Sequence, residues 1–346
     1  MKNKEIVYCL SLFLFIAGCK GKSNESILNE LDFTTIGEGF DIGDPTQIVA
    51  EDKCLSIIDR SGDSIVWRIN PENGEGGGRL YAKGVGPGEM LPPVNHLSAG
   101  DSIYVYSRPT FTLYSAPISK PDSIRKTGLV PFAVSRIFNF DNDRFIASLF
   151  PFGDSGVDAS KRFMIMDTSG KQLSLFGSYP RLWDSEKDYP DDVLASFHQT
   201  NSILIPDNSH IVAFTSNVMS VYKKRGDSYE SVLEKIIIPY EYDYTPATAN
   251  MSAMTNSRKD FGGVIVGACL YGDKIIAGIG GKKDGITVMK RFEVYDLEGN
   301  LERSFIPLED LLPVFTVSKD GCIFSLQENE NSTVLMKSSP LTISNL

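Results

Sequence analysis

The stretch Gly100-Asp101-Ser102-Ile103-Tyr104-Val105-Tyr106 joins a short polar turn to a run of β-branched and aromatic residues. Such a run suits a pleated, half-buried strand. Five other segments repeat this pattern, and their turns are Glu51-Asp52-Lys53, Asn142-Asp143-Arg144, Asn208-Ser209-His210, Gly272-Asp273-Lys274 and Lys319-Asp320-Gly321. A recurring strand-and-turn unit is the signature of a repeat architecture. Six units of one sheet each predict a six-bladed β-propeller.

We expect an all-β fold with four-stranded antiparallel blades over residues 33–346. The segment from Phe33 to Gly43 reads as a β segment separate from the first repeat. In closed propellers such a strand commonly completes the last blade. The sequence therefore predicts a ring that is closed by an N-terminal strand in the last blade.

The amino terminus carries a short basic region and then an apolar segment, Ile6 to Ala17, which is too short to span a bilayer as a permanent helix. The segment ends in Ile16-Ala17-Gly18-Cys19, which resembles a bacterial lipobox. The resemblance implies cleavage before Cys19 and diacylation of its sulfur, so residues 1–18 are expected to be a lipoprotein signal peptide. A plain secretory signal with a chance cysteine is the alternative.

Residues 19–32 are expected to form a flexible lipid-anchored tether, because the segment after Cys19 is polar and lacks apolar periodicity. Acyl chains contribute ~0.8 kcal/mol per buried methylene and hold a protein on a membrane without a transmembrane helix. Some bacterial groups mark surface lipoproteins with acidic residues directly after the cysteine, whereas Lys20 and Lys22 follow it here. We expect a location in the cell envelope, anchored in the outer membrane and facing the periplasm rather than displayed outside.

Composition limits the classes of partner. The 346 residues are 42% hydrophobic and carry a formal net charge of −10. A chain of this kind buries a substantial core, and its charge would repel the phosphates of a nucleic acid. We expect an unknown protein or a glycan as partner, membrane contact through the N-terminal lipid, and no nucleic acid.

Cysteine usage does not indicate a disulfide framework. Cleavage of the expected signal would remove Cys9 and Cys19 would be lipidated, which leaves Cys54, Cys269 and Cys322. Ring closure would bring Cys54 and Cys322 into neighbouring blades at equivalent positions. Face-packed sheets lie about 10 Å apart, whereas a disulfide needs Cα atoms within about 7 Å. We therefore favour three small core residues over a disulfide.

A glycine-rich segment, Gly84 to Met90, leads into the second unit and reads as a crossover loop. Its glycines allow backbone conformations closed to other residues, and its carboxylate can accept hydrogen bonds from loop amides. A phosphate-binding loop would continue into Lys-Ser/Thr and a helix, and this one continues into a strand. The residues assigned to the structural turn are Gly84, Gly86, Pro87, Gly88 and Glu89.

This loop, followed by the turn at Gly100, resembles the joint between successive NHL-type propeller repeats. It is still more similar to the six-bladed TolB-like propeller lipoproteins of Bacteroidetes. Residues 292–301 and 317–324 resemble the ending of that family, a strand, an Asp-x-x-Gly-Asn turn and a strand. The resemblance covers the lipobox and nearly all of the mature chain. It implies the fold and says little about function, because the matched residues are turn formers and core residues.

The middle blades exceed the ~40–45 residues of a compact propeller repeat, so the excess must lie in loops. Residues 179–199 form a first insertion and residues 240–263 a second. Both interleave aromatic residues, carboxylates and a basic residue, a mixture that stacks on sugar rings or forms a protein-binding hot spot. The alternative is that the aromatic residues only anchor long loops onto the blades. The candidate binding residues are Arg181, Trp183, His198, Tyr242, Tyr244 and Arg258.

Signals for catalysis are weak. The 3 histidines, His96, His198 and His210, lack zinc-binding spacing, and no Gly-x-Ser-x-Gly elbow is present. No catalytic residue and no metal ligand are predicted. No cofactor is predicted. Six-bladed propellers elsewhere can hold calcium on the channel axis through Asp, Glu and Asn, a set of residue types that here includes Asp191 and Asp192, but adjacent carboxylates more often form a solvated loop or the start of a helix.

We therefore expect a lipid-anchored β-propeller of the cell envelope. It would act as a binding or scaffold module for a partner protein or a carbohydrate, through its channel mouth and loop insertions. The alternative is an enzyme, a lyase or a lactonase-like hydrolase with an oxygen-ligated metal at the propeller axis. Several Asp, Glu or Asn side chains converging on the channel from different blades would favour the enzyme.

Overall fold

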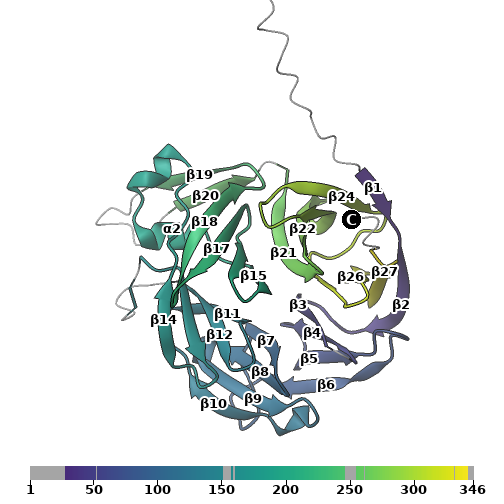
Figure 1. Ribbon diagram of the computed structural model, residues 1–346. Helices are drawn as coiled ribbons and strands as arrows, with labels where there is room; N and C mark the ends of the chain where they lie inside the picture. Colours follow the sequence, from purple (N-terminus) through teal and green to yellow (C-terminus); the bar gives the residue numbers. More distant parts are fainter. Residues whose placement is uncertain are drawn as a thin grey trace, which may run out of the picture.

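The computed structural model describes residues 28–51, 53–150, 157–158, 160–245, 255–260, 262–330 and 332–341. Within them, six sheets of four antiparallel strands surround a central axis (Figure 1), which confirms the predicted six-bladed propeller. The lipobox and most of the proposed tether lie outside the described residues. No helix in the described ranges is long and apolar enough to cross a membrane.

The strands of each blade follow one another in sequence, except in the sixth blade. Blade 1 has β3 (Pro45–Ala50), β4 (Leu55–Asp59), β5 (Ser64–Ile69) and β6 (Gly76–Ala82), and blade 2 has β7 (Val94–Ala99), β8 (Ser102–Ser107), β9 (Thr112–Pro117) and β10 (Arg125–Leu129). Blade 3 has β11 (Val134–Asn139), β12 (Arg144–Leu149), β13 (Phe163–Asp167) and β14 (Gln172–Phe176), and blade 4 has β15 (Ser202–Asp207), β16 (His210–Phe214), β17 (Val218–Arg225) and β18 (Ser228–Ile236). Blade 5 has β21 (Val264–Tyr271), β22 (Lys274–Lys283), β23 (Ile286–Tyr295) and β24 (Leu301–Pro307), and blade 6 has β25 (Phe315–Val317), β26 (Ile323–Glu328), β27 (Thr333–Ser338) and β2 (Phe33–Phe40).

The ring is closed by β2, which pairs antiparallel with β27 and supplies the outermost strand of the last blade. This confirms the predicted closure. A shorter strand, β1 (Leu28–Leu31), runs parallel to β24 and adds a fifth strand to blade 5. The N-terminal segment therefore ties two neighbouring blades together (Figure 1).

The core consists of one apolar cluster between each pair of adjacent blades. Neighbouring residues of one strand contribute to clusters on opposite sides of their blade. Ile57 packs toward blade 6 and Ile58 toward blade 2, and on β12 Phe145 packs toward blade 2 while Ile146 packs toward blade 4. This follows from the two-residue period of a strand, which sends successive side chains to opposite faces. Each fully buried aliphatic or aromatic side chain contributes roughly 1.5–3 kcal/mol.

The six turns that revealed the repeat all join the innermost strand of a blade to its second strand. Because the strands alternate in direction, these turns lie on one end of the ring, which we call the repeat-turn face. Asp207 shows how such a turn is fixed, since its Oδ1 accepts hydrogen bonds from the amides of Ser209 (2.6 Å) and His210 (2.8 Å). The connections between blades lie on the opposite end, which we call the insertion face.

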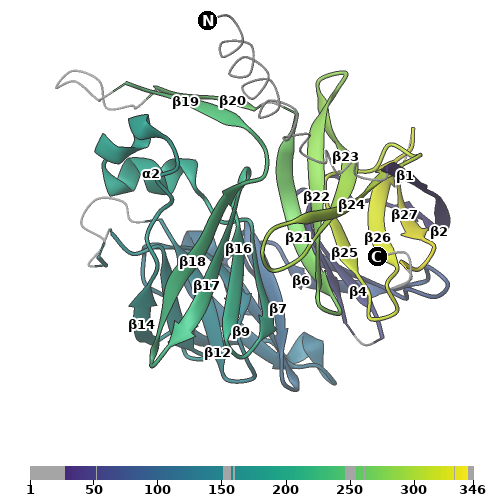
Figure 2. The ribbon, with the colours of Figure 1, turned by 45° about the horizontal axis from the view of Figure 1, so that its top comes forward.

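The insertion face carries most of the structure outside the blades. The first insertion contains the 3-10 helix η3 (Asp184–Asp188) and the only α-helix of the described chain, α2 (Asp191–Phe197). The second contains a hairpin of β19 (Tyr240–Thr245) and β20 (Thr255–Asp260). Figure 2 shows α2 and this hairpin at the same end of the molecule as the tip of β22 and β23. Two other 3-10 helices, η1 (Arg108–Thr110) and η2 (Pro121–Ser123), belong to blade 2.

Candidate functional site

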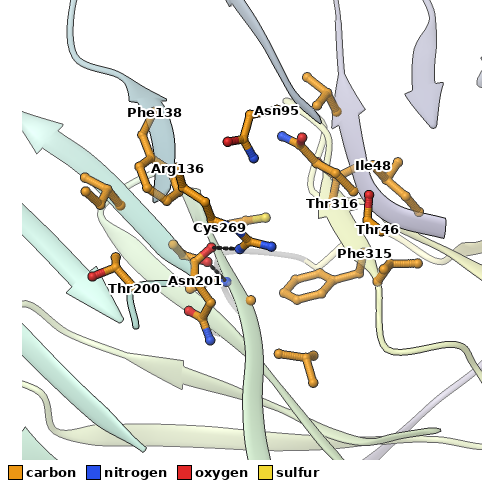
Figure 3. Close-up of a pocket in the computed structure, with 18 of the residues that line it drawn as sticks. Thr46, Ile48, Asn95, Arg136, Phe138, Thr200, Asn201, Cys269, Phe315 and Thr316 are labelled. Atoms are coloured by element: carbon orange, nitrogen blue, oxygen red, sulfur yellow. Dashed lines mark hydrogen bonds between the residues drawn. The ribbon is translucent and has the colours of Figure 1, made fainter. Parts of the chain in front are cut away.

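The innermost strands of the six blades surround a central channel with a volume of about 710 Å³. Figure 3 shows the side chains that these strands place around it. Sites for small ligands are commonly hollows of ~300–1,000 Å³ with a few placed polar groups. The channel is therefore the first candidate site.

Polar side chains at the wall of the channel join each of several blades to the next. Gln47 exchanges two hydrogen bonds with the backbone of His96, at 3.1 and 3.2 Å. Asn95 Oδ1 accepts from the amide of Ile137 (3.3 Å), and Asn201 Nδ2 donates to the carbonyl of Ile265 (2.6 Å). These bonds link blades 1 and 2, 2 and 3, and 4 and 5. Blades 3 and 4 are linked by an arginine, because Arg136 Nη1 donates to the carbonyl of Asn201 (3.1 Å) (Figure 3).

Arg136 brings a positive charge into the channel. None of the described residues that line the channel is Asp or Glu, and two further arginines, Arg60 and Arg108, lie at its wall. Arg60 is paired with Asp44 at 2.8 Å, and no ion pair of Arg136 or Arg108 occurs within the described ranges. Burial lowers the pKa of Arg136, and the charges of Arg108 and Arg60 lower it further. The channel therefore has a positive potential although the chain as a whole is acidic.

This lining does not suit a calcium ion. Calcium takes six to eight oxygen ligands, of which carboxylates are the strongest. The channel offers asparagines from three blades, Asn95, Asn139 and Asn201, but its described lining has no carboxylate, and Arg136 would repel a cation. No group of three or more His, Cys, Asp or Glu side chains within the described ranges is arranged to hold a metal. We therefore derive no chemistry from a metal on the axis.

The rest of the lining combines neutral polar groups with aromatic rings. Thr46, Thr316 and Gln199 supply hydroxyl and amide groups, and Phe138 and Phe315 supply ring faces. Figure 3 shows these phenylalanines on different sides of the channel. Such a mixture binds a polar organic ligand through hydrogen bonds and ring contacts.

The first insertion is organised by Arg181, one of the candidate binding residues. Its Nη1 donates to the carbonyls of Glu186 (2.7 Å), Lys187 (3.0 Å) and Tyr189 (2.8 Å), and its Nη2 pairs with Asp191 at 2.8 Å. The guanidinium thus connects η3 to the start of α2. These contacts occupy Arg181 within its own loop, and Asp191 is occupied with it.

Glu186 forms the buried centre of the same insertion. Its Oε2 accepts from the amides of Leu182 (2.7 Å) and Trp183 (3.2 Å), and its Oε1 accepts from the hydroxyl of Tyr240 (3.0 Å). Burial opposes ionisation of this carboxyl, but His198 and the loop amides outweigh it and lower the pKa of Glu186. Tyr240 opens β19, so Glu186 holds the two insertions together.

The other candidate binding residues are one buried residue, one half-exposed residue and three residues of the β19–β20 hairpin. His198 is buried beside Glu186, with Nε2 at 3.6 Å from Oε1, and its ring meets that of Tyr240 edge to face. Trp183 also contacts Tyr240 but leaves 42% of its surface exposed. The β19–β20 register places Tyr242 opposite Arg258 and puts Tyr244 two residues further along β19. The side chains of Tyr242, Tyr244 and Arg258 lie outside the described part of the structure.

The glycine-rich loop lies on the insertion face between β6 and β7. Glu89 Oε2 accepts from the amide of Gly86 (2.8 Å), and a Cβ on Gly84 would lie only 2.1 Å from that same oxygen. Gly88 has a φ of +80°, and Met90 is buried at 1% exposure between blades 1 and 2. Pro87 lies within the turn. These contacts give the loop a structural role.

His96 belongs to a buried polar network on the repeat-turn face. Its Nε2 lies 3.0 Å from Glu51 Oε1, and Glu51 also accepts from Ser56 Oγ (2.7 Å), Cys54 Sγ (3.1 Å) and Arg68 Nη2 (3.2 Å). Burial opposes ionisation of Glu51, but these hydrogen bonds, with that of His96 foremost, lower its pKa to about 2. The network joins blade 1 to blade 2. His210, on the same face, pairs with Asp207 at 2.9 Å.

Cys54, Cys269 and Cys322 are free thiols. Cys54 and Cys322 are buried, as expected for small core residues. Cys269 differs, because it is partly exposed and lines the channel (Figure 3).

Sequence reasoning did not single out Arg136. It stands in the innermost strand Val134-Ser135-Arg136-Ile137-Phe138-Asn139, whereas the innermost strands of the other blades carry no lysine or arginine. Superposing the six repeats would have revealed this charge. The candidate residues were chosen from the insertions, which stand out by their length, whereas Arg136 lies on a strand of the regular repeat.

Comparison with known proteins identifies the fold independently. A family model described as TolB-like 6-blade propeller-like matches residues 26–320. A structure from Bacteroides fragilis, of a protein described as exported, is similar with a TM-score of 0.56 at 11% identity and covers 90% of this chain and 95% of its own. Raptor of Chaetomium thermophilum gives a TM-score of 0.46 at 9% identity over 91% of this chain and 29% of its own. No curated protein matches the chain.

Proposed function

Because the chain belongs to the TolB-like six-bladed propeller family, we propose that it is a lipid-anchored binding module of the cell envelope. It takes its ligand, a carbohydrate or a segment of a partner protein, at the mouth of the central channel on the insertion face. The observation that carries this proposal is the channel of about 710 Å³, lined by neutral polar groups, aromatic rings and Arg136. The family fold itself is compatible with many functions, so the argument depends on this site.

The envelope location is supported by the lipobox-like Ile16-Ala17-Gly18-Cys19 and by the structural likeness to a protein described as exported. We expect native protein to incorporate labelled palmitate and to sediment with membranes. Cys19→Ser should abolish the labelling and leave a protein that washes off membranes. A Cys19→Ser variant that stays with the membrane fraction would overturn the anchor.

Binding at the channel mouth is tested by plugging it. Thr46 lies at the start of β3 on the insertion face and lines the channel, so Thr46→Trp would fill part of the mouth. The matched control is Thr34→Trp, because Thr34 lies exposed on β2 at the outer edge of blade 6. The full chain in detergent is applied to arrays of envelope glycans and acidic peptides. We expect Thr46→Trp alone to lose the ligand of the native protein; equal binding by both variants, or no ligand for the native protein, would contradict the proposal.

A further inference from the structure

Arg136 carries a charge that its structural contact does not need. The equivalent task of joining one blade to the next is performed by the neutral amides of Gln47, Asn95 and Asn201 in three other places. Arg136 uses only Nη1 for this contact, to the carbonyl of Asn201. Neutral amides thus join blades elsewhere in the ring, whereas a guanidinium loses hydration when it enters a channel.

The rest of the guanidinium is available to a ligand. No described residue accepts a hydrogen bond from Nε or Nη2 of Arg136, and these two nitrogens form one of the edges with which arginine grips a carboxylate or sulfate through two parallel hydrogen bonds. The contact to Asn201 fixes the orientation of the group before a ligand arrives. A preorganised donor pair of this kind increases affinity because little side-chain freedom is lost on binding.

The surroundings also select for an anion. The chain has a net charge of −10, yet none of the described residues lining the channel is acidic, and Arg108 lies at the same wall, as does Arg60, whose charge is paired with Asp44. The acidic outer surface repels anions in general. An anionic ligand therefore binds only if its contacts inside the channel outweigh this repulsion. The positive charge of Arg136 is partly shielded from bulk water. Its attraction to an anion is therefore stronger than it would be at an open surface.

We propose that the channel binds an acidic saccharide, with its carboxylate or sulfate group on Nε and Nη2 of Arg136. This inference rests on the proposed binding function and specifies its ligand class. The hydroxyls of Thr46 and Thr316 and the amide of Gln199 match sugar hydroxyls, and Phe138 and Phe315 offer faces for a ring. The channel volume of about 710 Å³ suits a small ligand rather than a protein domain.

The test compares charged and neutral sugars on one protein. Uronic-acid and sulfated oligosaccharides, neutral oligosaccharides of the same length, and acidic peptides are titrated by calorimetry onto the full chain in detergent. We expect the acidic sugars to bind and Arg136→Gln to weaken them by about 10- to 100-fold, which corresponds to a loss of about 1.4–2.7 kcal/mol of binding free energy for the charge-assisted pair as a whole. Glutamine keeps a polar amide at this position, and the melting temperature of the variant is measured beside its affinity to show that the propeller remains folded.

Matched controls locate the effect. Arg125→Gln removes the same charge from the exposed outer strand β10 and should leave binding unchanged. Arg136→Lys keeps the charge but loses the paired donors, and its affinity should fall between those of the native protein and Arg136→Gln. Added inorganic sulfate should compete with the acidic sugars.

Any of four results would overturn the inference. Equal affinity for neutral and acidic sugars, or full affinity in Arg136→Gln, would remove Arg136 as the anion site while leaving the channel as a binding site. Binding of acidic peptides in place of sugars would replace the saccharide by a protein ligand. Binding of none of these probes, including sulfate, would reject the anion site; the plugging experiment then decides separately whether the channel binds anything.

Discussion

The two faces of the ring follow different rules. On the repeat-turn face, every blade has a short turn between its first and second strands, and these turns share their polar character. On the insertion face, the connection between blades ranges from residues 130–133, between β10 and β11, to residues 237–263, between β18 and β21. Because the first two strands of every blade pair directly in register, the turn between them is short in every blade. The connections between blades can lengthen, and they surround the channel mouth. Stability and binding should therefore respond to mutation on different faces.

The largest effect is expected at Glu51, on the repeat-turn face. Glu51→Gln removes the charge that His96, Cys54 and Arg68 contact. The pKa of Glu51 falls from 4.5 to about 2 on folding, so its contribution to stability is complete above pH 4.5 and is lost as the pH falls toward 2. A shift of this size corresponds to about 3 kcal/mol. Urea unfolding should show that deficit at pH 7, and it should shrink steadily below pH 4.5.

The control is Glu72→Gln, because Glu72 is exposed in another turn of blade 1. It should change the free energy of unfolding by less than about 0.5 kcal/mol at any pH. A deficit in Glu51→Gln that stays constant from pH 7 to pH 3 would show that the carboxylate charge is not what stabilises the junction of blades 1 and 2.

A smaller loss is expected at Gly321, in the last repeat turn. Its φ is +82°, and a Cβ there would lie 2.6 Å from the ring of Tyr271 and 2.9 Å from the carbonyl of Leu341. Gly321→Ala should cost about 2 kcal/mol, combining the left-handed conformation with a steric overlap. Gly100→Ala, at φ +55° with nothing within 4 Å of the added Cβ, carries only the conformational cost. Equal thermal stability of the two variants would mean that the turn at Gly321 adjusts without strain.

The insertion face should respond locally. Glu186→Ala removes the acceptor for two loop amides and for Tyr240, but the small cluster of Tyr179, Leu194 and Ala195 is separate from the six clusters between blades. We expect the ring to lose about 1 kcal/mol or less, while trypsin cleaves at Arg181 or Lys187 about ten-fold faster or more, because local opening becomes easier. Asp184→Ala, at a side chain that is 95% exposed, is the control. A loss as large as that of Glu51→Gln would remove the distinction between the faces.

The sequence predicted the regular blades better than it predicted the contacts at the insertions and the channel. The repeat turns and the β-branched runs revealed the ring and its closing strand, because turn chemistry and strand periodicity are local properties of the sequence. The insertions were located by the length between repeats, but whether Arg181 would face a ligand or its own loop depends on three carbonyls brought near it by folding. Arg136 was missed because the positive channel arises from the absence of acidic residues at the described channel-lining positions, which come from six blades that are far apart in sequence.

The smallest effect expected is at Cys269, and it probes how far the channel reaches. This thiol lies near the repeat-turn end of β21, and burial raises its pKa to about 11. Because the thiolate is the reactive form, labelling by a small maleimide should be slow at pH 7 and rise about ten-fold per pH unit, with no change in stability. Cys54 and Cys322 are buried outside the channel lining and should stay unlabelled in the native protein. An acidic sugar held on Arg136 should slow the labelling of Cys269 by blocking the insertion-face mouth. If the ligand does not change the labelling rate of Cys269, the maleimide must also enter from the repeat-turn face. Access to the channel would then not be restricted to the insertion face.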